Sequence, residues 1–196
     1  MCANYEVKES DFEAFAELKL DPRFPPFKPS LFPGYDVPVF RADGPCLLRW
    51  GLVPSWSKTE RAEFSTFNAR SENVQKSPVF RGPFAKRRCL MPASSFFEWT
   101  KTKPKTRYRF IVDEAKPFLI AGIWDRWERD ETFVESVSML TTMANETVGR
   151  IHDRMPVILQ PSDYAWWLDP EAKSDNLLGL LVPFAGGMTG TLAPKT

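Results

Sequence analysis

Short apolar runs separated by turn residues are the feature that most constrains the fold of this chain. The runs CLMPASSFFEW, RYRFIV, PFLIAGIW, FVESVSMLTT and MPVIL are rich in valine, isoleucine, phenylalanine and tryptophan, which favour pleated, half-buried strands. Asp43-Gly44 lies inside VPVFRADGPCLLRWGLV and is typical of the turn of a β-hairpin. The order of these runs predicts many strands that are connected mainly by hairpins.

Helical signals are few and short. In SDFEAFAEL, Ser10 and Glu13 stand in the register of a capping box ahead of an apolar face, which predicts a helix of about three turns. Short helices are also expected near residues 71–76, 144–151 and 161–168. Five prolines in DPRFPPFKPSLFPG predict an extended, irregular segment that lies over the surface.

These patterns together predict an α+β fold. We expect a single domain over residues 1–196, built on a curled, largely antiparallel β-sheet that forms a barrel-like core with short helices at its periphery. A length of 196 residues suffices for one full hydrophobic core and is short for two. The 43% hydrophobic and 14% aromatic content fits a globular chain, which we expect to be a monomer.

The cysteine and histidine content argues against two common structural devices. Three widely spaced cysteines (Cys2, Cys46 and Cys89) do not make a disulfide framework, and with one histidine they give no recognisable zinc site. No apolar run is long enough for a membrane span, and the acidic stretch EVKESDFEAF is unlike a signal peptide. We therefore expect a protein of the reducing cytoplasm, with no metal, no cofactor and no membrane partner.

The charge is nearly balanced overall but is unevenly distributed. The formal net charge is +1, yet residues 81–109 include RGPFAKRR and KTKPKTRYR, whereas acidic residues dominate 125–136. A basic face that contains Arg87 and Arg88 could bind phosphates. The alternative, which is the more common one for such a segment, is a solvated pair of strands whose lysines protect its edge.

Two isolated polar residues are candidates for acid–base chemistry. The only histidine lies in IHDRMP, where His152 precedes a strand and can exchange a proton near pH 7, although a lone histidine is more often structural. Glu98 lies among aromatic residues in SSFFEW, where burial would raise the pKa of its carboxyl group. Strand alternation gives the alternative that Glu98 points outward to solvent.

The segments FNAR and RWGLVPSW supply candidates for positioning and binding. Asn68 can orient a nucleophile through its amide, and Arg70, two residues on, can share its strand face and hold a phosphate. The alternative is that FNAR is a turn that carries a solvated charge. Trp50 and Trp56 flank a proline-containing loop, where exposed aromatics would stack on unpaired bases, although buried tryptophans are more common.

The chain opens with MCANYEV, in which a cysteine directly follows the initiator methionine. Removal of Met1 would leave Cys2 with a free α-amine and a thiol on adjacent carbons. Taken alone, this position is better explained by chance than by chemistry. No phosphate-binding glycine loop, dinucleotide fingerprint or GxSxG motif accompanies it.

The order of these segments along the chain is more specific than any one of them. Cys2 after Met1, then RWGLVPSW, NARSE, RRCLMPASSFFEW, AGIWDRW, LTT and IHDRMPVIL, resemble in this order the SRAP family of SOS response-associated peptidase-like proteins. The resemblance covers roughly residues 2–170 and implies the fold of that family. Members of the family act on abasic sites in single-stranded DNA, to which the N-terminal cysteine crosslinks through a thiazolidine ring.

The resemblance also implies roles for the candidate residues. Asn68 would position the amine of Cys2. Glu98 would assist ring opening and proton transfer, and His152 would be the acid–base partner near the sugar. The implied DNA contacts are Arg70 and Arg154 at phosphates, Trp56 and Trp50 at bases, and Arg87 and Arg88 in the basic segment. The implied partner is single-stranded DNA with abasic sites, bound at the nucleoid within a bacterial or phage-type cytoplasm.

Two other functions stay open on the sequence. Cys2 could be the nucleophile of a peptidase that attacks a peptide carbonyl, with His152 or Glu98 as base, and removal of Met1 could be autocatalytic. The chain could also bind single-stranded DNA without catalysis, Cys2 being incidental. The start of the chain departs from the family, whose members usually begin Cys-Gly-Arg-Phe where this chain has CANYE.

Overall fold

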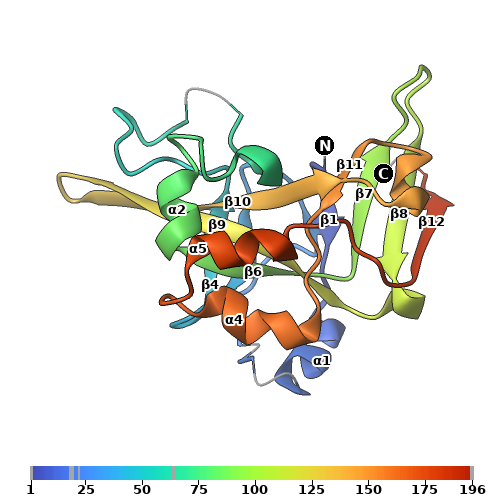
Figure 1. Ribbon diagram of the computed structural model, residues 1–196, viewed down its shortest axis with the longest axis horizontal. Coiled ribbons are helices and arrows are strands. Elements are labelled where there is room, and N and C mark those ends of the chain that lie inside the picture. Colours follow the sequence, from blue (N-terminus) through green and yellow to red (C-terminus); the bar gives the residue numbers. More distant parts are fainter. Residues whose placement is uncertain (1, 18–19, 22, 63–64, 195–196) are drawn as a thin grey trace.

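Two β-sheets form the body of the protein, and short helices lie around them (Figure 1). The structure is a computed structural model that describes the chain except for residues 1, 18–19, 22, 63–64 and 195–196. The strands within the described residues are β1 (Tyr5–Glu6), β2 (Ser30–Leu31), β3 (Asp36–Arg41), β4 (Gly44–Trp50), β5 (Asn68–Arg70), β6 (Arg88–Ala93), β7 (Ser95–Trp99), β8 (Arg107–Val112), β9 (Phe118–Arg129), β10 (Thr132–Met143), β11 (Arg154–Pro156) and β12 (Met188–Leu192). The α-helices are α1 (Phe12–Glu17), α2 (Arg81–Lys86), α3 (Glu146–Gly149), α4 (Tyr164–Leu168) and α5 (Ser174–Leu177), and the 3-10 helices are η1 (Glu9–Asp11), η2 (Ser71–Asn73), η3 (Asp113–Ala115), η4 (Pro161–Asp163) and η5 (Leu178–Leu180).

Five strands of the larger sheet close into a barrel. β4, β3, β6 and β9 follow one another through antiparallel pairs, and β10 closes the ring because it pairs antiparallel with β9 and parallel with β4. β5 and β11 extend the sheet beyond the ring. Near the C-terminal end of β10, Thr141 is opposite Arg70 of β5 on one edge and opposite Pro156 of β11 on the other. The end of β10 therefore holds two short strands from distant parts of the chain side by side.

The smaller sheet has the strand order β12-β8-β7-β1-β2 and is antiparallel throughout. Only Ser94 separates β6 in the barrel from β7 in the smaller sheet, so the chain passes directly from one sheet to the other. One continuous hydrophobic cluster joins the two, with Leu90 from β6 and Phe96 from β7 among its members. This shared core fixes β1, and with it the start of the chain, against the barrel.

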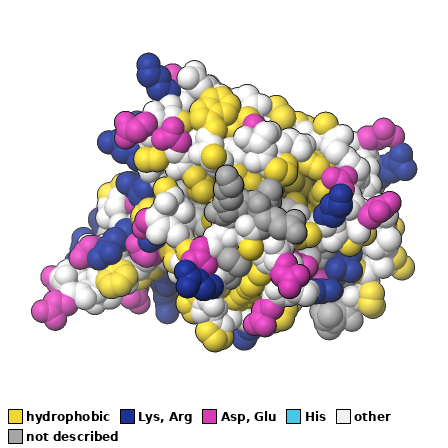
Figure 2. All heavy atoms as spheres, turned by 90° about the horizontal axis from the view of Figure 1, so that it is seen from below, with side chains coloured by type: hydrophobic (Ala, Val, Ile, Leu, Met, Phe, Trp, Pro, Cys, Tyr) yellow, Lys and Arg dark blue, Asp and Glu magenta, His cyan; other side chains and the backbone are white. Residues whose placement is uncertain are grey.

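The face that carries α1 and α4 has no large region of one charge sign. Figure 2 shows lysine, arginine and acidic side chains interspersed over the described part of this face, around a hollow lined by apolar side chains. A DNA backbone is bound by a concentration of positive charge. This face is therefore a poor candidate for nucleic-acid contact.

The expected fold class is confirmed: strands dominate, the sheets are mostly antiparallel, a barrel closes and the helices are short. The expected hairpin around Asp43-Gly44 is formed by β3 and β4. The first helix is present over η1 and α1, but its capping box uses Asp11, whose carboxylate accepts a hydrogen bond from the Lys8 amide at 2.8 Å. The expectation of a box with Glu13 was therefore wrong in register.

Candidate active site

Cys2 is held at the start of the N-terminal strand, against β7. Tyr5 is opposite Phe96 in the β1–β7 pair, and the Phe97 amide donates to the Asn4 carbonyl at 3.0 Å, which continues this pairing toward the N-terminus. The Cys2 residue is fully buried, and its thiol donates to the Asn4 carbonyl at 3.4 Å. Burial raises the pKa of the thiol, and the carboxylate of Glu98 raises it further.

Asn68 reaches Cys2 from the larger sheet. It begins β5 and is fixed by its pairing with Met139 of β10. The side-chain amide of Asn68 donates a hydrogen bond to the Cys2 carbonyl at 2.7 Å, so it ties the N-terminal strand of the smaller sheet to the larger one. The carbonyl oxygen of the same side chain is buried and accepts no hydrogen bond from any described residue. This oxygen is thus an acceptor beside the main chain of Cys2.

Glu98 is buried within β7. Its residue is 1% exposed, and burial raises the pKa of the carboxyl group to about 7. Strand alternation does not carry Glu98 to solvent, because Phe96 on its own face and Phe97 on the other are both buried as well. The sequence-based expectation of a desolvated carboxyl group is therefore correct, and the outward-facing alternative is wrong. At neutral pH such a group exists in both protonation states and can give or take a proton.

His152 faces Glu98 from the segment between α3 and β11. The imidazole Nδ1 lies 3.9 Å from a carboxylate oxygen of Glu98 and 3.2 Å from a carboxylate oxygen of Asp153. The amide of Arg154 donates to the same Nδ1 at 3.1 Å, so in the neutral ring the proton is on Nε2. Burial lowers the pKa of His152. A neutral imidazole that carries its proton on Nε2 can donate a hydrogen bond from that nitrogen.

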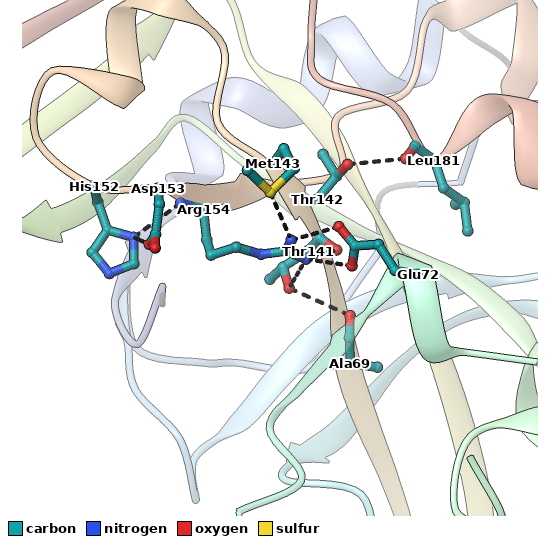
Figure 3. Close-up of polar contacts among 9 residues, drawn as sticks. All are labelled: Ala69, Glu72, Thr141, Thr142, Met143, His152, Asp153, Arg154 and Leu181. Atoms are coloured by element: carbon teal, nitrogen blue, oxygen red, sulfur yellow. Dashed lines mark hydrogen bonds and ion pairs between the residues drawn. The ribbon is translucent and has the colours of Figure 1, made fainter. Parts of the chain in front are cut away.

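Arg154 binds within the protein and links the segments around the site (Figure 3). Its guanidinium donates to both carboxylate oxygens of Glu72, at 2.6 and 3.0 Å, and to the Thr141 carbonyl at 2.7 Å. The sulfur of Met143 lies 3.5 Å from the same group. The ion pair lowers the pKa of Glu72. A DNA phosphate would have to displace one of these partners to bind Arg154, whose side chain is 7% exposed.

The expectation that Trp50 stacks on DNA bases is wrong, because its side chain is fully buried. The ring packs edge-on against Tyr5 with centroids 5.2 Å apart, and the indole nitrogen donates to the Phe67 carbonyl at 2.8 Å. Tyr5 is three residues after Cys2, and Phe67 immediately precedes Asn68. Trp50 therefore packs against β1, which follows Cys2, and bonds the residue that precedes β5, which begins with Asn68.

The basic segment separates into one buried and one partly exposed arginine. Arg88 is 4% exposed and donates to the carbonyls of Trp167 at 2.8 Å and Phe84 at 2.9 Å, so the expectation that it contacts DNA is wrong. Arg87 keeps 31% of its side chain exposed and forms an ion pair with Asp125 at 3.0 Å. The alternative of a solvated pair of strands does not describe β6, which begins with Arg88 and whose residues are all buried.

Three other residues offer exposed groups. Arg70 is exposed at the end of β5, two residues after Asn68, and Trp56 is 61% exposed. Lys101 follows β7 and pairs with Asp153 at 3.0 Å, which brings the lysine-rich loop between β7 and β8 beside His152. Sequence reasoning did not single out Lys101 or Glu72. The lysine repeat KTKPK signalled a charged loop, but only the ion pair with Asp153 locates that loop next to the site.

Within the described part of the chain, no group of three or more histidine, cysteine, aspartate or glutamate side chains is arranged to hold a metal ion. None of the described helices has the length and apolar character of a membrane span. The reactive groups at the site are a thiol, a carboxyl group whose pKa is about 7, an imidazole whose pKa is lowered and side-chain amide groups.

Sequence comparisons link the chain to curated relatives. It is 33% identical over 196 residues to the abasic site processing protein YoaM of Bacillus subtilis, and the match covers 94% of this chain and 86% of YoaM. It is 39% identical over 141 residues to the abasic site processing protein YoqW of the same organism, covering 70% of this chain and 63% of YoqW. The rat abasic site processing protein HMCES is 29% identical over 170 residues, and the chain spans about half of its length, 48%.

Solved structures share the fold. A protein from Bacteroides thetaiotaomicron superposes with a TM-score of 0.88 at 25% identity, over 98% of this chain and 92% of that one. A protein from Bordetella bronchiseptica gives a TM-score of 0.86 at 24% identity, over 99% and 100% of the two chains. The profile of the family described as SOS response associated peptidase (SRAP) matches residues 1–192. With the ordered motifs, the barrel and these matches in agreement, the chain belongs to the SRAP family.

Proposed function

We propose that this protein processes abasic sites in DNA by capturing them covalently on Cys2 once Met1 has been removed. The observation that carries the proposal is that two polar side chains meet at Cys2. Asn68 donates a hydrogen bond to the Cys2 carbonyl, and the negative charge of Glu98 raises the pKa of the Cys2 thiol. His152 lies beyond Glu98. The names of the relatives, abasic site processing proteins, support the same substrate.

The proposed chemistry requires the α-amine as well as the sulfur. The ring-opened form of an abasic site is an aldehyde. The amine adds to its carbon and loses one water to give a Schiff base, and the thiol then adds across the C=N bond, sulfur bonding to carbon and its proton ending on nitrogen. The product is a five-membered thiazolidine. An internal cysteine cannot react in this way, because its nitrogen is part of a peptide bond.

The raised pKa of the Cys2 thiol favours an order for the two additions. The thiol stays protonated at neutral pH, so it is a weak nucleophile before the substrate binds. An α-amine has a reference pKa of about 7.7–8.0, so an appreciable fraction is neutral and reactive. The amine therefore attacks first, and the sulfur closes the ring after the Schiff base has formed.

Three side chains would assist these steps. The side-chain carbonyl oxygen of Asn68 would accept a hydrogen bond from the amine and so orient the lone pair of the amine nitrogen. Glu98, with a pKa of about 7, would protonate the departing oxygen when the sugar opens and relay the thiol proton to the Schiff-base nitrogen. The Nε2 proton of His152 would stabilise the sugar oxygen.

Nonspecific contacts would hold the DNA. Arg70, two residues after Asn68, and Lys101, which pairs with Asp153 next to His152, are exposed and could bind phosphates. Trp56 could stack on a flanking base. Arg154 would instead maintain the site through Glu72, because its guanidinium is already bonded. Unpaired DNA would suit these contacts, since stacking needs an accessible base face.

A single assay separates this proposal from its alternatives. Purified protein is incubated with single-stranded DNA that carries one abasic site, and adducts are resolved on denaturing gels and by intact mass spectrometry. We expect an adduct at the mass of protein plus DNA minus one water, which disappears in Cys2→Ala. Binding without an adduct would leave a noncovalent DNA binder, and Cys2-dependent cleavage of a peptide without an adduct would leave a peptidase; either result refutes the proposal.

A further inference from the structure

The strand that follows Cys2 is short, and Asn4, which lies between them, makes several hydrogen bonds to neighbouring segments. β1 contains only Tyr5–Glu6, so Cys2 lies outside its ladder. Asn4 precedes the strand and is fully buried. Its side-chain amide donates to the Leu31 carbonyl at 3.1 Å and to the Ser30 hydroxyl at 3.2 Å, which ties it to β2. The main-chain carbonyl of Asn4 accepts both the Phe97 amide and the Cys2 thiol.

The side-chain carbonyl oxygen of Asn4 accepts a hydrogen bond from a buried guanidinium. Arg107, at the start of β8, donates from Nη2 to the Asn4 side-chain carbonyl at 2.6 Å. The Arg107 residue is 7% exposed, and its guanidinium lies over the ring of Phe97 at 3.7 Å from the centroid. Nη1 donates to the Pro194 carbonyl at 3.2 Å, which joins the C-terminal segment to the same group.

Burying an arginine at this position lowers the stability of the folded protein relative to burying an apolar side chain. The printed partners of its guanidinium among the described residues are the carbonyl oxygens of Asn4 and Pro194, which carry no formal charge, and its Nε is buried without an acceptor. Desolvating a charge without pairing it costs free energy that an apolar side chain would avoid. Unlike an apolar side chain, the planar guanidinium can donate a hydrogen bond to Asn4 and at the same time stack on the Phe97 ring of β7.

We propose that Asn4 and Arg107 are positioning residues for the reaction of Cys2, an inference that rests on the proposed function. The guanidinium holds the side chain of Asn4, and the main chain of Asn4 fixes both the thiol of Cys2 and its distance from Glu98 on the neighbouring strand. Neither residue touches the substrate. Loss of either contact lets residues 2–4 move away from β7, and a displacement of about 1 Å at reacting groups can cost a hundredfold in rate.

Arg109 offers a matched control on the same strand. It is the same residue type two positions along β8, it also contacts β1, through Glu6 at 3.7 Å, and it also has a buried Nε without an acceptor. Its contact lies at the far end of β1 from Cys2, so it can stabilise the sheet without setting the position of the nucleophile. Arg109→Met therefore reports the effect of a lost arginine on β8 alone.

The test compares Arg107→Met, Asn4→Ala, the double variant and Arg109→Met. Affinity is measured with DNA that carries a tetrahydrofuran abasic analogue, which cannot open to an aldehyde, and the crosslinking rate constant is measured at saturating abasic DNA. For Arg107→Met and Asn4→Ala we expect unchanged affinity and a rate reduced about tenfold to a hundredfold. The double variant should be no slower than the slower single one, because both changes remove the same contact.

Hydrogen exchange gives a readout that does not depend on activity. The Phe97 amide, bonded to the Asn4 carbonyl, should exchange faster in Arg107→Met and Asn4→Ala but not in Arg109→Met. If wild-type protein forms no adduct, the proposed function fails while the exchange data still test the positioning. If wild-type protein crosslinks and Arg107→Met is as fast, or Arg109→Met is slowed equally, the positioning role is refuted.

Discussion

Replacement of Glu98 by glutamine should make the protein more stable and less reactive at the same time. The carboxyl group has a pKa of 4.5 in the unfolded chain and about 7 in the folded protein, where burial disfavours its charged form. Below pH 4.5 the group is protonated in both states and the pKa difference has no effect. As the pH rises toward 7 the unfolded chain loses the proton first, so the folded state becomes progressively less stable.

The difference between the two pKa values sets the magnitude. Each pKa unit corresponds to about 1.4 kcal/mol, so raising the pKa from 4.5 to about 7 costs the folded state about 3 kcal/mol above pH 7. Glutamine has nearly the same shape and never ionises. Glu98→Gln should therefore match wild-type protein near pH 4 and exceed its free energy of unfolding by about 3 kcal/mol at pH 8.

Urea unfolding of both proteins at pH 4, 5.5 and 8 measures this difference. Glu146→Gln is the control, since the Glu146 side chain is 88% exposed and its replacement should give no comparable rise with pH. In the crosslinking assay Glu98→Gln should react about 10²- to 10⁴-fold more slowly with little change in DNA affinity. A variant less stable than wild type at pH 8 would refute the reasoning, because it would mean that the folded site favours the carboxylate.

Three further outcomes are expected. Insertion of one glycine between Met1 and Cys2 should abolish the adduct and leave the melting temperature unchanged, because the reactive nitrogen would be lost; an undiminished adduct in the gel assay contradicts the aminothiol chemistry. Trp50→Ala should lower the free energy of unfolding by about 3–5 kcal/mol in urea titrations, as expected for a buried ring. Arg70→Ala should weaken binding to single-stranded DNA and reduce the slope of log affinity against log salt by about 1, whereas Arg88→Ala should lower stability and leave that slope unchanged.

The strands and the acid–base residues could be predicted because they depend on local composition. β8 coincides with the run RYRFIV, and the aromatic sequence context of Glu98 correctly predicted that this residue is buried. The helix α2 could not be found in this way, since RGPFAK contains a glycine and a proline that disfavour helix. β12 was missed for a related reason: MTGTL is short and has a glycine at its centre, which weakens the strand signal, and its pairing with β8 makes it a strand.

The exposure of single side chains was the least predictable property. Trp50 and Trp56 occur in one motif, yet the first is fully buried and the second is 61% exposed. Arg87 and Arg88 are adjacent, and only the second is bonded by the carbonyls of α2 and α4. In both pairs the local sequence is equally compatible with either outcome. The difference is made by segments 17 to 79 residues away, whose approach is a property of the folded sheet and not of the motif.

The residues of the candidate site come from distant segments of the chain, which explains why each of them alone gave only a weak functional signal in the sequence. Cys2 precedes β1 of the smaller sheet and Glu98 lies in β7 of the same sheet, whereas Asn68 lies in β5 of the larger sheet and His152 in the segment that enters β11. They meet because the end of β10 holds β5 and β11 on its two edges while β7 continues directly from the barrel strand β6. Since the N-terminal strand is only two residues long, the nucleophile depends on contacts from both sheets for its position. The amide of Asn68 supplies such a contact from the larger sheet and the guanidinium of Arg107 supplies one from the smaller sheet. The reactivity of Cys2 should therefore be more sensitive to these two contacts than the stability of the fold is.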